Sequence, residues 1–194
     1  MTTRLIAPPR RLFMSRSAHA TLSAAAVGLL AGGSTGARAQ STSSIAADVG
    51  ILNVALALEH EAINAYQLGA ASGLLQKAVL DVAVTFQSHH MAHRDALVAT
   101  IQKLGGQPVA EKKLDHYAAT LNAGTLKNQA DVLTLASKLE LGATNAYLGV
   151  IPAFGDKGLA QVAARLAADE TMHYTALMGA LGRALPGGAL SFGA

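Results

Sequence analysis

The sequence predicts an all-α protein, an antiparallel four-helix bundle made of two duplicated hairpins joined by one long crossover. Four long segments rich in alanine and leucine carry apolar residues at three- and four-residue spacing, without the alternation that strands would show. Short breaks separate the segments within each pair, whereas the link at 105–127 separates the two pairs. A sequence signature also recurs in the second half of the chain, so each hairpin is one copy of a repeat.

The first 39 residues are expected to form a twin-arginine-type signal peptide. Arg-Arg-Leu-Phe-Met at 10–14 resembles a twin-arginine export motif, a weakly apolar run follows at 20–31, and Ala-Arg-Ala at 37–39 resembles a small-x-small cleavage site. The apolar run is too short to cross about 30 Å of hydrocarbon, which takes about 20 residues, so we expect no stable membrane anchor. The domain would then span 40–194 and lie in the periplasm or outside the cell.

Composition narrows the chemistry of the remaining chain. Five of the fifteen basic residues and none of the twelve acidic ones precede residue 40, so ten basic residues face twelve acidic ones in the rest. This balance, together with the lack of a basic run, argues against a nucleic-acid partner. The absence of cysteine excludes disulfides, thiolate nucleophiles and iron–sulfur clusters, which leaves histidine and carboxylate chemistry.

The first hairpin is expected to pair helices at 44–71 and 74–104. Gly73 follows the first helix and Gly105 the second, and glycine readily takes the left-handed conformation that ends helices. The link at 105–127 can run the full side of a bundle. The third helix can therefore start beside the start of the second.

The second hairpin is expected to pair helices at 128–152 and 157–183. Asn128, with Asp131 three residues later, has the pattern of a capped helix start. Pro186 should end the fourth helix, because proline cannot continue the helical hydrogen-bond ladder.

The repeated signature carries the ionisable residues. Leu-Glu-His-Glu-Ala-Ile-Asn-Ala-Tyr at 58–66 recurs as Leu-Glu-Leu-Gly-Ala-Thr-Asn-Ala-Tyr at 139–147. His-Met-Ala-His-Arg-Asp-Ala-Leu at 90–97 recurs as Glu-Thr-Met-His-Tyr-Thr-Ala-Leu at 170–177. Each half therefore combines a helix carrying one Glu with a helix carrying a ligand-x-x-His pair. Helical periodicity places these residues within apolar stripes.

A divalent cation is the simplest explanation for ionisable groups in such stripes. Burying an ionised carboxylate costs several kcal/mol unless a partner compensates it, and arginine and lysine are scarce on these stripes. Oxygen and nitrogen ligands suit iron or manganese first, and also zinc. The alternative is a hydrogen-bonded polar layer in a bundle that binds no metal. The candidate ligands are Glu59, His90, His93, Glu140, Glu170 and His173.

This pattern resembles that of the ferritin-like di-iron and di-manganese carboxylate proteins, which have a Glu on each of two helices and Glu-x-x-His on the other two. The motifs Ala-Leu-Glu-His-Glu-Ala-Ile-Asn-Ala-Tyr, His-Arg-Asp-Ala-Leu and Lys-Leu-Glu with Asn-Ala-Tyr resemble an exported bacterial ferritin-like family of poorly defined activity. The resemblance covers residues 44–183. It implies that Glu59 and Glu140 are terminal carboxylates and that His93 and His173 are terminal imidazoles. Glu170 would be a bridging carboxylate.

His90 departs from this pattern, because it stands where a second bridging Glu is expected. Three carboxylates leave two divalent ions one charge short of neutrality, so a bound hydroxide or a single ion would restore the balance. The expected cofactor is therefore one or two divalent metal ions. His89 is an alternative to His90, although it points roughly 100° away around the helix.

Other polar residues near the stripes are expected to have lesser roles. Tyr66 and Tyr147 follow the two glutamates by one heptad and are expected to pack, with a hydrogen bond to a ligand as the alternative. The remaining expectations are edge or surface positions for His60, Glu61 and His116, and helix contacts for Asn64 and Asn145.

Two functions remain open from the sequence. The first is a metal-binding protein whose paired iron or manganese reacts with dioxygen or peroxide, with enzymatic activity left undecided. The second is a non-catalytic metal-binding or interaction bundle that has lost the paired redox site. Metal ions are the expected partner, and the alanine-rich helix faces are compatible with a homodimer.

Overall fold

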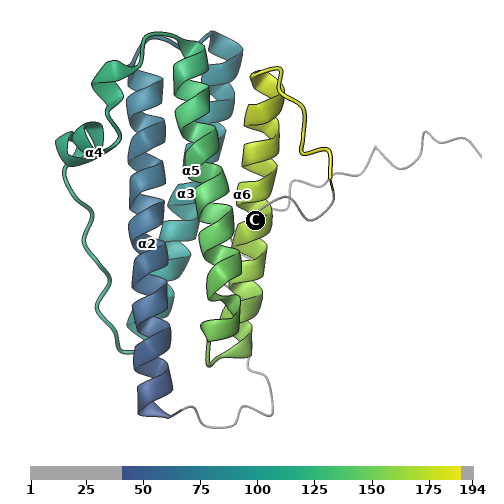
Figure 1. The fold of residues 1–194 in the computed structure, drawn as a ribbon. Helices are drawn as coiled ribbons and strands as arrows, with labels where there is room; N and C mark the ends of the chain where they lie inside the picture. Colours follow the sequence, from purple (N-terminus) through teal and green to yellow (C-terminus); the bar gives the residue numbers. More distant parts are fainter. Residues whose placement is uncertain (1–40, 189–194) are drawn as a thin grey trace, which may run out of the picture.

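Four long helices make up the bundle in a computed structural model that describes residues 41–188 (Figure 1). The predicted signal peptide lies outside the described residues. The helices are α2 (Thr42–Ala71), α3 (Lys77–Lys103), α5 (Gln129–Val150) and α6 (Lys157–Ala180). The predicted all-α bundle is thus confirmed, and the helix ends differ from the expected ones by at most three residues.

The helix ends follow the chemistry of the residues that flank them. Gly73 and Gly105 both have positive φ, at 70° and 78°, as the predicted breaks require. Asn128 caps α5 by accepting a hydrogen bond from the backbone N–H of Asp131 at 3.0 Å. The fourth helix ends at Ala180, earlier than expected, because Gly182 takes a positive φ of 66° and turns the chain away.

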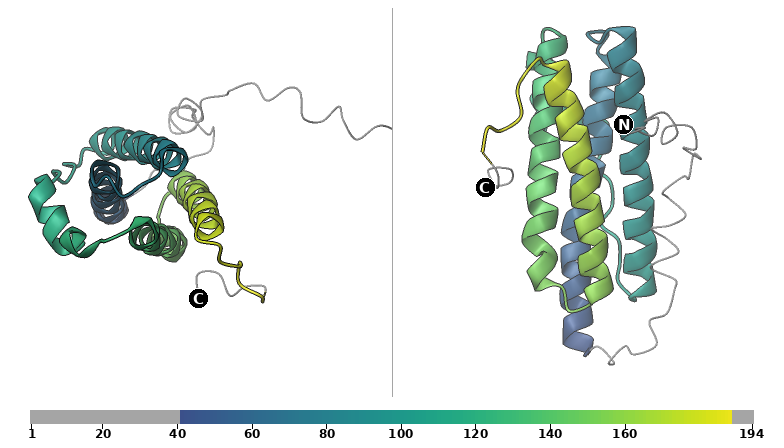
Figure 2. Two further views of the ribbon diagram at one scale, coloured as in Figure 1. Left: turned by 90° about the horizontal axis from the view of Figure 1, so that it is seen from above. Right: turned by 90° about the vertical axis from the view of Figure 1, so that its right-hand side faces the viewer.

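The crossover sets the direction of the second hairpin. Helices α2 and α3 are antiparallel neighbours, as are α5 and α6 (Figure 2). The link between the hairpins returns along the outside of α2, so α3 and α5 begin at the same end of the bundle (Figure 1). There the backbone N–H of Gln76 donates to the side chain of Gln129 at 2.8 Å. This is the predicted topology.

The crossover is bound tightly to α2. The side chain of Asn53 donates to the Gln107 carbonyl at 3.0 Å and accepts from the Val109 N–H. Further along α2, His60 Nε2 lies 3.3 Å from the Val109 carbonyl, and His60 is only 5% exposed. The expected edge or surface position of His60 is therefore wrong, because the crossover covers that face of α2. His116 is exposed, as expected.

Two short helices within the crossover were not predicted from the spacing of apolar residues. They are α4 (Leu114–Thr120) and the 3-10 turn η1 (Ala123–Thr125). A helix of seven residues is marginal on its own and depends on packing. Here Tyr117 is buried and its hydroxyl accepts a hydrogen bond from the Lys112 N–H at 3.1 Å.

The aliphatic core fills the end of the bundle where α2 begins. It includes Leu56 and Ile101, both fully buried, and Leu159 from α6. Of the helices in residues 41–188, α2 alone is long and apolar enough to cross a membrane, a test of composition that core helices of soluble bundles also pass. In this fold α2 packs against α3 and α5. The aliphatic core thus occupies one end of the bundle, and the buried charged residues described below lie beside it, in the middle of the long helices.

Candidate metal centre

The six residues predicted as ligands come together in the middle of the bundle. Each is between 0% and 8% exposed, although all six carry ionisable side chains. One or two of them come from each of the four long helices. In the described part of the chain they form two groups whose ligand atoms lie within 4.8 Å of one another. The groups are Glu59, His90, His93 and Glu170, and His90, Glu140, Glu170 and His173.

The first group joins the first hairpin to α6. His90 Nδ1 lies 2.8 Å from Glu59 Oε2 and 3.8 Å from Glu170 Oε1. His93 Nδ1 lies 3.2 Å from Glu170 Oε1 and 3.7 Å from Glu59 Oε1. All these atoms are types that bind first-row metal ions.

The second group joins the second hairpin to α3. His173 Nδ1 lies 3.0 Å from Glu170 Oε2 and 3.5 Å from Glu140 Oε1. His90 Nε2 lies 3.2 Å from Glu140 Oε1. His90 and Glu170 thus belong to both groups, and the two nitrogens of His90 face the glutamates of different hairpins.

Two tyrosines connect the hairpins across the site. The hydroxyl of Tyr66 donates to Glu140, and the hydroxyl of Tyr147 donates to Glu59. Each tyrosine therefore binds the glutamate of the opposite repeat. Burial, followed by the charge of the glutamate it contacts, raises the pKa of each tyrosine well above its usual value, so both hydroxyls stay protonated donors. The expectation that they only pack is wrong, since periodicity within one helix does not show cross-helix partners.

Two further side chains hold the outer nitrogens of the terminal histidines. Asp169 Oδ2 lies 3.3 Å from His93 Nε2, and His89 Nδ1 lies 2.9 Å from His173 Nε2. Partners of this kind fix the orientation of a metal-binding imidazole. His89 therefore does not replace His90; it supports His173 from the more exposed side of α3.

Asp169 is the one contact of the Glu/His cluster on α6 that sequence reasoning missed. It directly precedes Glu170, so it lies about 100° away from that residue around α6 and off the apolar stripe. The available signal was the adjacent Asp-Glu pair one turn before His173. Its carboxylate adds a fourth negative charge beside the cluster, in contact with the outer nitrogen of His93.

The carboxylates of the cluster raise the pKa values of His90 and His93 far above the usual value for histidine. Burial alone would lower the pKa of His90, but hydrogen bonds to Glu140 and Glu59 outweigh it and raise the pKa to about 10. Burial also opposes the charged form of His93, but its hydrogen bond to Asp169 and the nearby carboxylates of Glu170 and Glu59 raise its pKa to about 12. For Glu59, burial alone would raise the pKa, but its histidine neighbours lower it to about 2. Imidazolium and carboxylate groups therefore neutralise one another.

Some buried ligand atoms nevertheless lack a hydrogen-bond partner within residues 41–188. They include Glu140 Oε2, Glu170 Oε1 and His93 Nδ1. The last two lie 3.2 Å apart without the geometry of a hydrogen bond. Buried polar atoms are rarely left unsatisfied in a folded protein. The donor set and its unsatisfied atoms fit divalent ions better than they fit a closed network of hydrogen bonds.

The repeated asparagines lie outside both groups. Asn64 donates to the His60 carbonyl at 2.8 Å and to Glu111 in the crossover at 2.6 Å. Asn145 is partly buried on α5. Asn64 thus lies outside the cluster, as expected, but its side-chain partner is in the crossover and not on another helix.

Solved structures with the same fold have low sequence identity to this chain. A conserved hypothetical protein from Mycobacterium tuberculosis is 21% identical, with a TM-score of 0.60, over 76% of this chain and 99% of that one. A structure described as ferritin-like, diiron-carboxylate proteins from Bacillus anthracis is 22% identical, with a TM-score of 0.56, over 71% of this chain and 97% of that one. At these identities the likeness shows the fold.

No curated protein matches the chain significantly. The model of the ferritin-like domain family matches residues 47–183, which include all four long helices almost completely and every residue of the buried Glu/His cluster. That cluster is consistent with a dimetal carboxylate site. The chain belongs to the ferritin-like domain family.

Proposed function

We propose that this protein binds two divalent ions, iron or manganese, between its hairpins and uses them in redox chemistry with dioxygen or peroxide. The observation that carries the proposal is the pair of overlapping buried groups, which share His90 and Glu170. The related structure from Bacillus anthracis is described as a diiron-carboxylate protein, which favours iron for this chain as well. Zinc suits the same ligands but would not support redox chemistry.

The residues divide naturally between two ions. Glu59 and His93 would hold one ion and Glu140 and His173 the other, and Glu170, which belongs to both groups, would contribute to either. Neutral His90 can serve one of the two ions through a single nitrogen. Asp169 brings the carboxylates to four, which is the number that neutralises two divalent ions.

The protein would contribute shielding and orientation to this chemistry. A bound pair of iron or manganese ions supplies one-electron redox steps toward dioxygen or peroxide. The ligand residues are nearly inaccessible to solvent, and both tyrosine hydroxyls hold glutamate oxygens in place. Asp169 and His89 hold the outer nitrogens of the terminal imidazoles.

Counting metal ions in protein purified from its export compartment tests the proposal. We expect about two iron or manganese ions per chain in the wild type. Glu170→Ala should lose both ions, because Glu170 belongs to both groups, whereas Glu59→Ala and Glu140→Ala should each lose one. Glu61→Ala, on the same helix as Glu59 but outside both groups, should keep two. Full occupancy in Glu170→Ala would overturn the ligand assignment.

A non-catalytic bundle is the second candidate, and one observation favours it. The histidines and carboxylates can neutralise one another without a metal, as the raised pKa of His90 and the lowered pKa of Glu59 indicate. The two candidates differ in peroxide consumption by the metal-loaded protein. Two bound ions and metal-dependent peroxide loss support the enzyme, whereas no metal after gentle purification supports the polar layer.

We also propose export through the twin-arginine route. The support is the Arg-Arg-Leu-Phe-Met sequence at 10–14 and the cleavage-site pattern at 37–39. That route can carry proteins already folded around a cofactor. Replacing Arg10 and Arg11 by lysine should leave the uncleaved protein in the cytoplasm on cell fractionation, and normal export of this variant would exclude the route.

A further inference from the structure

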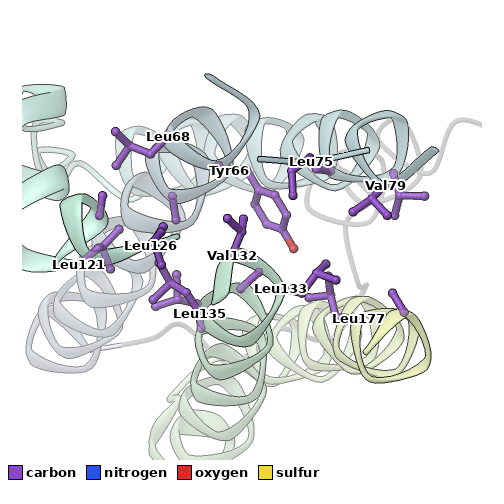
Figure 3. A pocket seen from close by; sticks show the side chains of 18 of the residues that line it. Tyr66, Leu68, Leu75, Val79, Leu121, Leu126, Val132, Leu133, Leu135 and Leu177 are labelled. Carbon is purple, nitrogen blue, oxygen red and sulfur yellow. The ribbon is translucent and has the colours of Figure 1, made fainter. Parts of the chain in front are cut away.

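An apolar cavity lies next to the candidate metal centre. It has a volume of about 210 Å³ and is lined by all four long helices and by Leu121 and Leu126 of the crossover (Figure 3). Tyr66 is its one lining residue with a polar side chain, and aliphatic side chains and a glycine make up the rest. Close packing leaves few voids of this size in a protein interior. The cavity is therefore a feature that needs a physical account.

Tyr66 connects the cavity to the centre. Its ring lines the cavity, and its hydroxyl donates to Glu140. Ala136 lines the cavity one helical turn before Glu140, and Leu177 lines it one turn after His173. One turn of helix is about 5.4 Å long, so the cavity begins about one turn from the ligands.

The cavity is open to solvent on the side of α3 and α6. Val82 on α3 and Ala176 on α6 both line it, and both are exposed. These two helices make few contacts with each other, unlike the helices within each hairpin. A small molecule can therefore enter between them without passing through the packed end of the bundle.

The lining decides what can bind. An ordered water needs two to four polar partners, and the only polar side-chain atom here already donates its hydrogen to Glu140. A cavity of about 150 Å³ lined by Leu, Ile and Phe stays dry and takes up benzene. A somewhat larger apolar cavity suits a ring compound of about six to ten carbon atoms.

We propose that the cavity binds the organic substrate of the centre, a small uncharged apolar ring compound that contacts the ring of Tyr66. Calling this compound a substrate rests on the proposed redox function; its binding does not. A charged compound of the same size is excluded, because no side chain in the cavity can compensate a buried charge.

Toluene is the probe, with benzoate as a charged compound of similar size. Calorimetric titration of metal-free and metal-loaded protein should both show saturable toluene binding at one site per chain. The dissociation constant should be on the order of 0.1–1 mM for a ligand of about seven heavy atoms. Benzoate should not bind. Ala136→Phe should weaken toluene binding at least about tenfold by filling the cavity, and Ala99→Phe, on an exposed face of α3, should leave it unchanged.

Three results would overturn the proposal. They are no saturable toluene binding, equal binding of benzoate, and undiminished binding by Ala136→Phe. If Ala136→Phe loses its helical circular dichroism, Ala83→Leu fills the same cavity with a smaller side chain and replaces it. Toluene binding by a protein that takes up no metal would refute the redox function and leave the cavity site intact. Two bound ions without toluene binding would refute the cavity alone.

Discussion

Replacing Tyr147 by phenylalanine should destabilise the metal-free protein by about 2 kcal/mol. Tyr147 is 2% exposed, and its hydroxyl donates to Glu59, which is 1% exposed. The substitution keeps the ring and removes the donor, so a buried charged oxygen loses a partner that water cannot replace. Hydrogen bonds to charged groups contribute about 1.5–3 kcal/mol, and Glu59 keeps its contact with His90 at 2.8 Å, so the expected loss lies within that range.

Urea denaturation of protein stripped of metal measures this change as the free energy of unfolding. A loss of about 2 kcal/mol corresponds to a fall in Tm of roughly 4–8 °C for a domain of this size. Tyr66→Phe should have an effect of similar size, because Tyr66 makes the equivalent bond to Glu140.

Tyr117→Phe is the matched control. Tyr117 is also buried, but its hydroxyl accepts a hydrogen bond from an uncharged group, the backbone N–H of Lys112 in the crossover. Its loss should cost about 0.5–1 kcal/mol, since neutral hydrogen bonds contribute less. If Tyr147→Phe and Tyr66→Phe destabilise the protein no more than Tyr117→Phe does, the two tyrosine–glutamate bonds do not hold the hairpins together.

Three further predictions follow from the same contacts. Asp169→Asn should keep two ions per chain but weaken metal affinity roughly 10–100-fold in a chelator competition assay, because His93 loses the charged partner that orients it. Unchanged affinity would show that Asp169 has no role in the site. In metal-free protein, the raised pKa of His90 stabilises the fold fully below about pH 6.5 and this contribution is lost as the pH rises through about 10. The lowered pKa of Glu59 stabilises the fold above about pH 4.5, and this contribution is lost as the pH falls through about 2. Urea midpoints should therefore be highest between about pH 4.5 and 6.5. A midpoint still rising at about pH 9 would contradict the sign for His90, and one that rises as the pH falls below about 4 would contradict the sign for Glu59. Asp48→Ala should lower the free energy of unfolding by about 2–3 kcal/mol and leave two metal ions per chain. The buried carboxylate of Asp48 accepts hydrogen bonds from two backbone N–H groups at the start of α6, at 2.8 and 3.1 Å. Loss of metal in this variant would show that Asp48 is coupled to the centre.

The sequence was sufficient for the long helices and for the gathering of the Glu and His side chains in the middle of the bundle. Both follow from periodicity, since a stripe that holds Glu59 or Glu170 among leucines must face the interior of a bundle. The repeat then brings the two halves to the same place. Their convergence could be predicted because these Glu and His residues lie on the helix faces that also carry the apolar signal.

The missed features depend on contacts between distant segments. His60 looks like an edge residue within its own helix, and it is buried because residues of the crossover near Val109 cover it. The partners of Tyr66 and Tyr147 lie on the other hairpin. Asp169 acts from the flank of its helix, where neither apolar periodicity nor the ligand-x-x-His spacing marks it.

The tyrosine of each hairpin donates to the glutamate of the other hairpin, and this arrangement bears on how the two halves could come to differ. Two separate copies of one hairpin could make the same reciprocal bonds around a true dyad, but any replacement in one copy would appear in the other. Fusion into a single polypeptide removes that constraint, so an imidazole can stand at position 90 while a carboxylate stands at 170. The linked architecture thus permits the two halves of the Glu/His cluster to differ inside a nearly symmetrical frame.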